Sequence, residues 1–238
     1  MNTSSKRKEN EITFSKMLPL FFFILTLLIF NQTSYATDCL GPINAKINVI
    51  YLHGIDTTKP NSLELQNRER LQKIANALSA RISLPRSPQL CKDQTKLCWN
   101  PNIDQAENAK ALLQEATELS KECFHSNDSQ PHLIGFSSGG FLVNKIIRYC
   151  LKRNFQSIMS IGASSATDES DPRDLTNCSP LRMLVSRTEA TREAAEKFYS
   201  IIKQRNGNIR LDYFDGDHEL PQKETLKILD EQIKDTEK

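Results

Sequence analysis

Beyond residue 36, apolar and polar positions follow two patterns that alternate along the chain. Short runs of β-branched and other apolar residues predict buried strands, and longer segments with apolar residues at helical spacing predict helices. The predicted strands are 47–53, 132–137, 157–164, 181–186 and 209–214, and 82–88 forms at most a short strand. The predicted helices are 63–82, 104–120, 140–152, 190–205 and 221–234.

This alternation predicts an α/β fold, in which a mostly parallel sheet is covered by helices on both faces. No second hydrophobic pattern marks another domain, so we expect residues 37–238 to form one domain. The sequence has no long apolar insertion of the kind that forms a lid, and we therefore expect no lid domain.

The first 36 residues have the layout of a secretory signal peptide. Four basic residues come first, and the uncharged apolar run 17–30 follows them. Ser34 and Ala36 then form a small-x-small cleavage site, which predicts cleavage after Ala36 and a secreted or periplasmic protein. The alternative is an uncleaved signal anchor. The apolar run is shorter than the roughly 20 residues that a membrane span needs, so we expect no stable span after cleavage.

Without this leader the chain has no net charge. The leader holds four of the 31 basic and two of the 29 acidic side chains, which leaves 27 of each sign. A nucleic-acid-binding protein typically has a basic surface, so the charge balance argues against a nucleic-acid partner.

All six cysteines follow the leader, and an even number of cysteines in an exported chain predicts disulfides. Cys91 and Cys98 flank a short polar loop and are the one pair that we predict, while the other pairings stay open. No C-x-x-C motif and no zinc-like Cys/His spacing is present, so we expect neither a metal nor a cofactor.

Candidate chemistry lies directly after the predicted strands, where parallel sheets place their functional groups. The segment "GFSSG", residues 135–139, fits G-x-S-x-G and lies between a predicted strand and a predicted helix. In that context Ser137 is a candidate nucleophile, raised above the sheet by a strained turn. The alternative is a serine that only satisfies its own turn. An acidic residue and His218 follow later strands, in the chain order of a Ser-acid-His triad.

Three segments resemble one family of known enzymes. "HGID" at 53–56, "GFSSGG" at 135–140 and "GDHELPQKETL" at 216–226 are similar to motifs of the carboxylesterase, lysophospholipase and acyl-protein thioesterase group of α/β-hydrolases. The likeness covers most of residues 47–235. It implies an α/β-hydrolase fold with Ser137 as nucleophile and His218 as base. It further implies an oxyanion hole formed by the backbone N–H groups of Ile55 and Ser138.

The acid of the triad departs from the family pattern. The family has His-Gly-x-x-Asp after its penultimate strand, whereas this chain has "VSRTE" at 185–189. Glu189 occupies the position of the aspartate, and glutamate is the acid of some hydrolases. The alternative is an ordinary acidic residue at a helix start, where its charge favours the helix dipole. Asp168 is the reserve candidate.

The sequence therefore predicts an exported serine hydrolase that cleaves carboxylic esters, or thioesters, through an acyl-enzyme. Its partner would be a small-molecule or lipid acyl ester. Two alternatives stay open: an α/β-hydrolase-like binding protein without activity, and a serine peptidase on the same fold. For His53, His125 and His132 we expect structural or surface roles, and for Trp99 a position packed beneath the Cys91–Cys98 loop.

Overall fold

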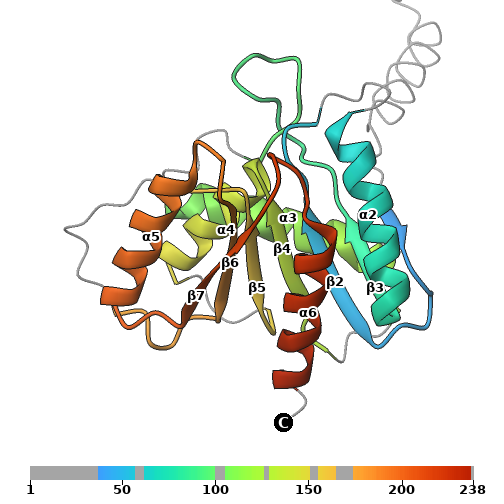
Figure 1. Cartoon of the computed structure of the whole chain (residues 1–238). Helices are drawn as coiled ribbons and strands as arrows, with labels where there is room; N and C mark the ends of the chain where they lie inside the picture. Colours follow the sequence, from blue (N-terminus) through green and yellow to red (C-terminus); the bar gives the residue numbers. More distant parts are fainter. Residues whose placement is uncertain are drawn as a thin grey trace, which may run out of the picture. The chain divides into compact units, whose positions relative to one another are not determined.

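The predicted strands and one short strand that the pattern does not predict, β1, form one seven-stranded sheet in the computed structural model (Figure 1). The structure describes residues 37–56, 62–99, 105–125, 129–150, 155–164 and 174–236, all within the unit Tyr35–Lys238. The predictions for residues 1–36 and for Asp168 lie outside these ranges. The sheet order is β1-β3-β2-β4-β5-β6-β7, and β1 is antiparallel to β3 while the other neighbours are parallel. The strands are β1 (Asp38–Leu40), β2 (Ile47–Leu52), β3 (Ala80–Leu84), β4 (His132–Phe136), β5 (Ile158–Ile161), β6 (Leu181–Ser186) and β7 (Ile209–Phe214).

Helices cover both faces of this sheet, as the alternating pattern predicts (Figure 1). The helices on one face bury an apolar cluster with alternate side chains of β2 and β6. The helices on the other face bury a second cluster with the remaining side chains of the same strands. Successive side chains of a strand point to opposite faces, so each central strand contributes to both clusters. The first face carries α3 (Ala106–Ser120), α4 (Ser138–Arg148) and α5 (Arg192–Gln204), and the second carries α2 (Leu63–Leu78) and α6 (Gln222–Thr236).

The predicted helix 63–82 is wrong at its C-terminal end. The helix α2 ends at Leu78, Ser79 takes a left-handed conformation with φ of 50°, and β3 begins at Ala80. Ile82 continues the helical spacing of apolar residues, but it lies in β3 opposite Val49 of β2. Pairing with a central strand decides the conformation of this short segment, because its hydrophobic period fits both structures.

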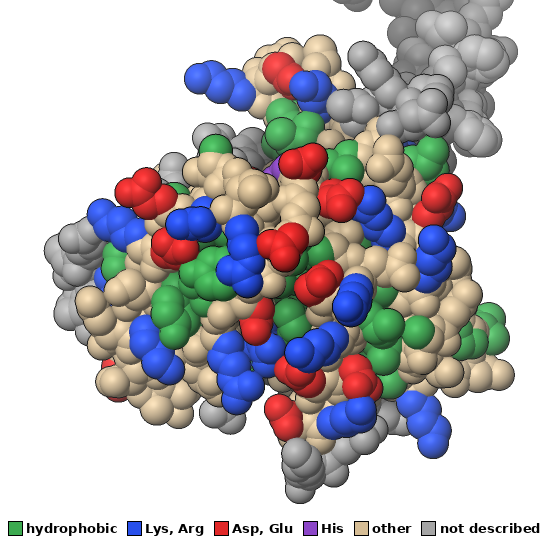
Figure 2. Space-filling view, viewed as in Figure 1, with side chains coloured by type: hydrophobic (Ala, Val, Ile, Leu, Met, Phe, Trp, Pro, Cys, Tyr) green, Lys and Arg blue, Asp and Glu red, His purple; other side chains and the backbone are tan. Residues whose placement is uncertain are grey.

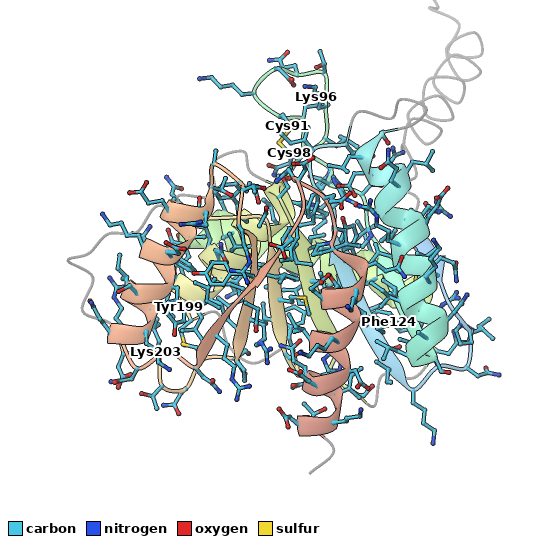
Figure 3. The ribbon with its side chains drawn as sticks, viewed as in Figure 1. Cys91, Lys96, Cys98, Phe124, Tyr199 and Lys203 are labelled. Carbon is cyan, nitrogen blue, oxygen red and sulfur yellow. A yellow bond between two sulfur atoms is a disulfide. The ribbon has the colours of Figure 1, made fainter. Side chains whose placement is uncertain are left out.

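Three disulfides join all six cysteines. The structure confirms the predicted Cys91–Cys98 pair and adds Cys39–Cys123 and Cys150–Cys178, with Cα–Cα distances of 5.3–5.5 Å. Cys91 and Cys98 close a loop that projects beyond the sheet (Figure 3). Cys39 lies in the edge strand β1, so its bond attaches that three-residue strand to the end of α3 through the short 3₁₀ segment Lys121–Cys123.

The face of the molecule seen in Figure 2 shows no dominant charge. In Figure 2, Lys and Arg side chains alternate with Asp and Glu side chains across the visible face. Within the described ranges, no helix is long and apolar enough to cross a membrane, and no group of His, Cys, Asp or Glu side chains is arranged to hold a metal ion.

Removing the disulfide that closes the long loop should destabilise the protein more than removing the one that closes the short loop. The Cys39–Cys123 bond closes a separation of 84 residues, and the Cys91–Cys98 bond closes one of 7. The loop-entropy relation predicts that losing the first costs about 2 kcal/mol more than losing the second. Urea unfolding of the two paired Cys→Ala variants measures this difference, and equal losses would contradict it.

Candidate active site

Ser137 occupies a strained turn between β4 and α4. Its φ is 50° and its ψ is −113°, a conformation that residues other than glycine rarely adopt. The Ser137 N–H donates to Ile161 O of β5 at 2.9 Å, and its carbonyl accepts the N–H of Phe141 at 2.9 Å. A side chain at Gly139 would overlap the backbone of Leu52 in β2, so a glycine lets the helix approach the sheet closely. The serine is thereby held at the carboxyl ends of the central strands.

His218 and Glu189 meet Ser137 from two other loops. His218, in the loop between β7 and α6, has its Nε2 atom 2.9 Å from Ser137 Oγ. Its Nδ1 atom makes a short hydrogen bond with Glu189 Oε1, from the loop between β6 and α5. Because a carboxylate only accepts, Nδ1 carries the proton, and Nε2 is free to accept the Ser137 hydroxyl. The three side chains therefore form one hydrogen-bonded chain from hydroxyl to carboxylate.

The electrostatics of the pair favour an imidazolium beside a carboxylate. The hydrogen bond that His218 donates to Glu189 raises the pKa of His218 above its ordinary value, against the opposing effect of partial burial. Burial alone would raise the pKa of Glu189, but the hydrogen bond and charge of His218 outweigh it and hold that pKa below its usual range. The Glu189 side chain is only 8 % exposed, so little solvent competes for the bond. This arrangement can take a proton from Ser137 and stabilise the resulting charge.

Two neighbouring residues shape the space around His218. The ring of Phe136, the last residue of β4, lies against the imidazole with 5.0 Å between ring centroids. Gly162, just after β5, has φ of 57°, and a side chain there would meet the His218 ring at 3.3 Å. Phe136 lies within the "GFSSGG" motif, but its contact with His218, like that of Gly162, is made only in the fold.

The two residues predicted to supply oxyanion N–H groups lie on adjacent turns. Ser138 is the first residue of α4, where backbone N–H groups lack partners within the helix. Ile55 follows β2, which pairs with β4, and its side chain is 50 % exposed. The Gly139 N–H donates to His53 O at 3.1 Å and joins the two turns. The Ser138 hydroxyl is buried and accepts the N–H of Trp99 at 3.3 Å, so its side chain is engaged away from His218.

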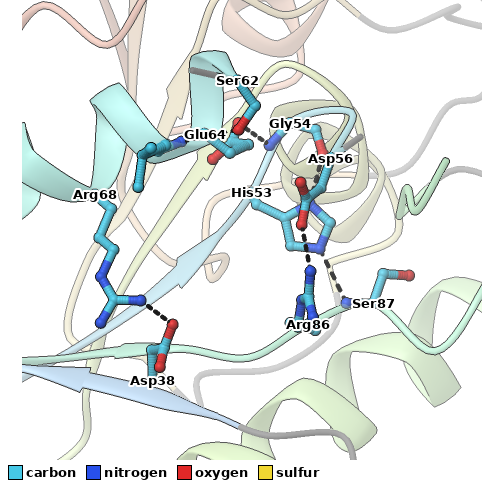
Figure 4. Close-up of polar contacts among 10 residues, drawn as sticks. Asp38, His53, Gly54, Asp56, Ser62, Glu64, Arg68, Arg86 and Ser87 are labelled. Atoms are coloured by element: carbon cyan, nitrogen blue, oxygen red, sulfur yellow. Dashed lines mark hydrogen bonds and ion pairs between the residues drawn. The ribbon is translucent and has the colours of Figure 1, made fainter. Parts of the chain in front are cut away.

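One charged residue next to these turns was missed by the sequence analysis. Glu64, in the first turn of α2, accepts the Gly54 N–H at 2.7 Å (Figure 4). It also accepts the Tyr51 hydroxyl at 3.0 Å. An acidic residue in a first turn is normally explained by the helix dipole, so the sequence carries no signal for this contact.

The remaining histidines and Trp99 take structural places. His53 is buried and accepts the N–H of Ser87 through Nε2 at 2.9 Å, while burial lowers its pKa. His132 is buried against Ser157, and burial lowers its pKa to about 4. His125 is exposed. Trp99 is fully buried, with 5.4 Å between its ring centroid and that of His53, as expected for a packed residue.

Comparison with solved structures identifies the fold. The chain is similar to acyl-protein thioesterase 2 of Zea mays, with 14% identity, a TM-score of 0.61, and 83% of this chain and 98% of that chain covered. It is also similar to the Bacillus cereus carboxylesterase, with 15% identity, a TM-score of 0.59, and 87% and 98% covered. Arabidopsis thaliana SOBER1 matches with 18% identity, a TM-score of 0.58, and 81% and 99% covered. The chain therefore has the α/β-hydrolase fold.

Sequence comparison adds no family assignment. No family model matches the chain, and no curated protein sequence matches it.

The His218 imidazole should titrate above its ordinary value of 6.5 and should depend on Glu189. Replacing Glu189 with Gln removes the charge that favours the imidazolium, so the His218 pKa should fall. An NMR titration of the histidine ring protons measures both values, and the His132 signal, with a pKa of about 4, is the internal control. An unchanged His218 pKa in Glu189→Gln would refute the interaction.

Proposed function

We propose that this chain is a serine hydrolase that cleaves carboxylic esters, including thioesters, through an acyl-enzyme. The observation that carries the proposal is the hydrogen-bonded chain of Ser137, His218 and Glu189 at the carboxyl ends of three strands. Esterases and a thioesterase among the structures of the same fold support the choice of substrate class. The substrate would be a small-molecule or lipid acyl ester.

Ser137 starts the reaction in this mechanism. Its hydroxyl loses a proton to His218 Nε2 while its oxygen attacks the acyl carbonyl carbon. Glu189 stabilises the imidazolium that forms, and the imidazolium then protonates the departing alcohol or thiol. Water then attacks the acyl carbon and gives a proton to the same nitrogen. As the bond from the acyl carbon to the serine oxygen breaks, the imidazolium returns that proton to Ser137 and the carboxylic acid leaves. All proton transfers thus pass through one atom, Nε2.

The tetrahedral intermediates need donors for their negative oxygen. In our proposal the backbone N–H groups of Ile55 and Ser138 supply them, one from each of the two turns beside Ser137. Removal of one such donor typically slows an acyl transfer by about 10²–10³-fold. The half-exposed Ile55 side chain also offers apolar surface next to the reacting carbonyl, which suits an acyl group.

Export is a separate part of the proposal. The basic leader, the apolar run and the Ser34-x-Ala36 site support cleavage after Ala36, and three disulfides suit an oxidising compartment. We expect extracytoplasmic protein to begin at Thr37. N-terminal sequencing of that fraction tests this, and a sequence beginning at Met1 would favour a signal anchor instead.

Ser137→Ala should abolish hydrolysis and leave the fold intact. The loss in kcat should be on the order of 10⁶-fold, because the members of a triad act as a unit, and His218→Ala should be nearly as severe. Labelling by a fluorophosphonate probe and turnover of a panel of acyl esters measure the effect. Ser138→Ala is the matched control and should retain much of the activity, since its backbone N–H remains.

Failure of this experiment has two distinct forms. If Ser137→Ala keeps parental hydrolysis, Ser137 is not the nucleophile. If the parent cleaves no ester and accepts no probe, the protein is a binding protein on this fold. A parent that is labelled but cleaves only peptides would be a peptidase.

Comparison of Glu189→Gln with Asp168→Asn identifies the acid. Glu189→Gln should lower kcat by about 10⁴-fold, the loss seen when a triad acid becomes an amide and the imidazole takes the wrong tautomer. Asp168→Asn should stay close to the parent. Steady-state kinetics on one ester measure both values of kcat. A larger loss of kcat in Asp168→Asn than in Glu189→Gln would make Asp168 the acid of the triad.

A further inference from the structure

A polar cluster beneath the site joins two of its loops. Glu64 Oε1 accepts the Gly54 N–H at 2.7 Å (Figure 4). Glu64 Oε2 accepts the Tyr51 hydroxyl at 3.0 Å. The Asn67 amide, one helical turn further along α2, donates to Glu64 Oε1 and to the Tyr51 hydroxyl oxygen, each at 3.3 Å. The Glu64 carboxylate thus receives three hydrogen bonds and is the centre of the cluster.

The same cluster reaches the loop that carries His218. Asn67 Oδ1 accepts the backbone N–H of Leu220 at 3.3 Å, two residues beyond the histidine. Arg70, also on α2, forms an ion pair with Glu219 at 2.5 Å and donates to Leu220 O at 3.3 Å. Helix α2 therefore holds both the turn after β2 and the turn before α6.

Side chains hold the two peptides on either side of Gly54. His53 Nε2 accepts the Ser87 N–H, so its Nδ1 carries the proton and donates to Gly54 O. The C=O and N–H of a trans peptide point in opposite directions, so holding this carbonyl also sets the direction of the Ile55 N–H. Glu64 fixes the preceding N–H, that of Gly54. A Cβ atom at residue 54 would lie 2.7 Å from Glu64 Oε1, so the glycine lets the carboxylate approach this backbone closely.

We propose that Glu64 is a positioning residue for the oxyanion hole, and that through Asn67 it also sets the register of the His218 loop. The inference rests on the proposed hydrolase function, because it concerns the Ile55 N–H group that would bind the oxyanion in that reaction. Capping of α2 does not account for Glu64, since Ser62 already caps this helix by accepting the Leu65 N–H. Its hydrogen bonds come instead from the turn after β2, from Tyr51 of that strand and from Asn67, which in turn contacts the His218 loop.

The charge of Glu64 also acts on the base. Burial raises the pKa of Glu64 to about 7, against its three hydrogen bonds, which favour the ionised form. The ionised carboxylate adds to the effect of Glu189 in raising the pKa of His218. The charged and titratable groups around this pair come from β2 and its turn, α2, the β6–α5 loop and the β7–α6 loop: Tyr51, Asp56, Arg70, Glu189 and Glu219.

Two variants of Glu64 separate geometry from charge. Glu64→Gln keeps an oxygen for the Gly54 N–H and removes the charge, whereas Glu64→Ala removes the acceptor. Glu69→Gln, an exposed position on the same helix, is the matched control and should behave like the parent. Each full-length protein is assayed for kcat, KM, the pH profile of kcat/KM and thermal unfolding, with active sites counted by fluorophosphonate labelling taken to completion.

We expect Glu64→Ala to lower kcat per labelled site by about 10²–10³-fold, the loss of one oxyanion donor, with KM changed much less. Glu64→Gln should keep kcat within about tenfold. The base must be neutral to act, so activity falls as the pH drops through the His218 pKa. Removing the Glu64 charge lowers that pKa, and the acidic limb of the Glu64→Gln profile should move to lower pH.

A purely structural role gives a different result. It would lower the unfolding temperature and the number of labelled sites, but leave kcat per site and the acidic limb unchanged, and that result overturns the inference. If Glu64→Ala does not fold, Glu64→Asp decides instead, because it keeps the charge and shortens the reach to the Gly54 N–H. An unchanged kcat per labelled site in Glu64→Asp is then the negative result. A parent without hydrolysis or labelling refutes the proposed function itself, whereas an active parent with unaffected Glu64 variants refutes only the inference.

Discussion

The left-handed turn at Ser137 is the constraint on which the site depends. A residue with a side chain holds φ of 50° only where surrounding bonds enforce it, and here β5 accepts the serine N–H while α4 begins at once. The turn fits because helix and sheet approach closely at Gly139, where a side chain would overlap β2. His218 and Glu189 can act on Ser137 only if this turn holds the serine in place. The proposed chemistry therefore depends on the packing of α4 against the sheet.

Much of the fold follows from the hydrophobic pattern, and its failures have clear causes. The central strands β2 and β4 to β7 and the helices facing them carry patterns long enough to identify them. Strand β1 has only three residues and lies at an antiparallel edge, too short for a periodic signal. The end of α2 was misplaced because Ile82 suits a helix and a strand equally, and only its pairing with β2 separates them.

Some residues of the site can be predicted from local sequence motifs, whereas others depend on contacts between distant segments. Ser137 and His218 lie in sequence motifs, and Glu189 could be placed because it follows a strand whose end had to lie beside theirs. Glu64 has no such signal. Its contacts with Gly54 and Tyr51 join a helix start to the preceding strand and turn, and its link to the His218 loop spans the whole domain through Asn67 and Leu220. Sequence patterns describe each element separately, whereas this residue acts between elements.

The disulfides leave the three residues of the candidate site outside every closed loop. The closed loops span 39–123, 91–98 and 150–178. Ser137 precedes the loop 150–178, and Glu189 and His218 follow it, so this bond shortens the chain between them but does not hold them together. It bypasses a separation of 28 out of the 81 positions between Ser137 and His218, so an unfolded chain with all three bonds intact would not bring the two side chains into contact. Hydrolytic activity would therefore report on the intact sheet itself, and oxidative refolding could complete every cross-link before any active site exists.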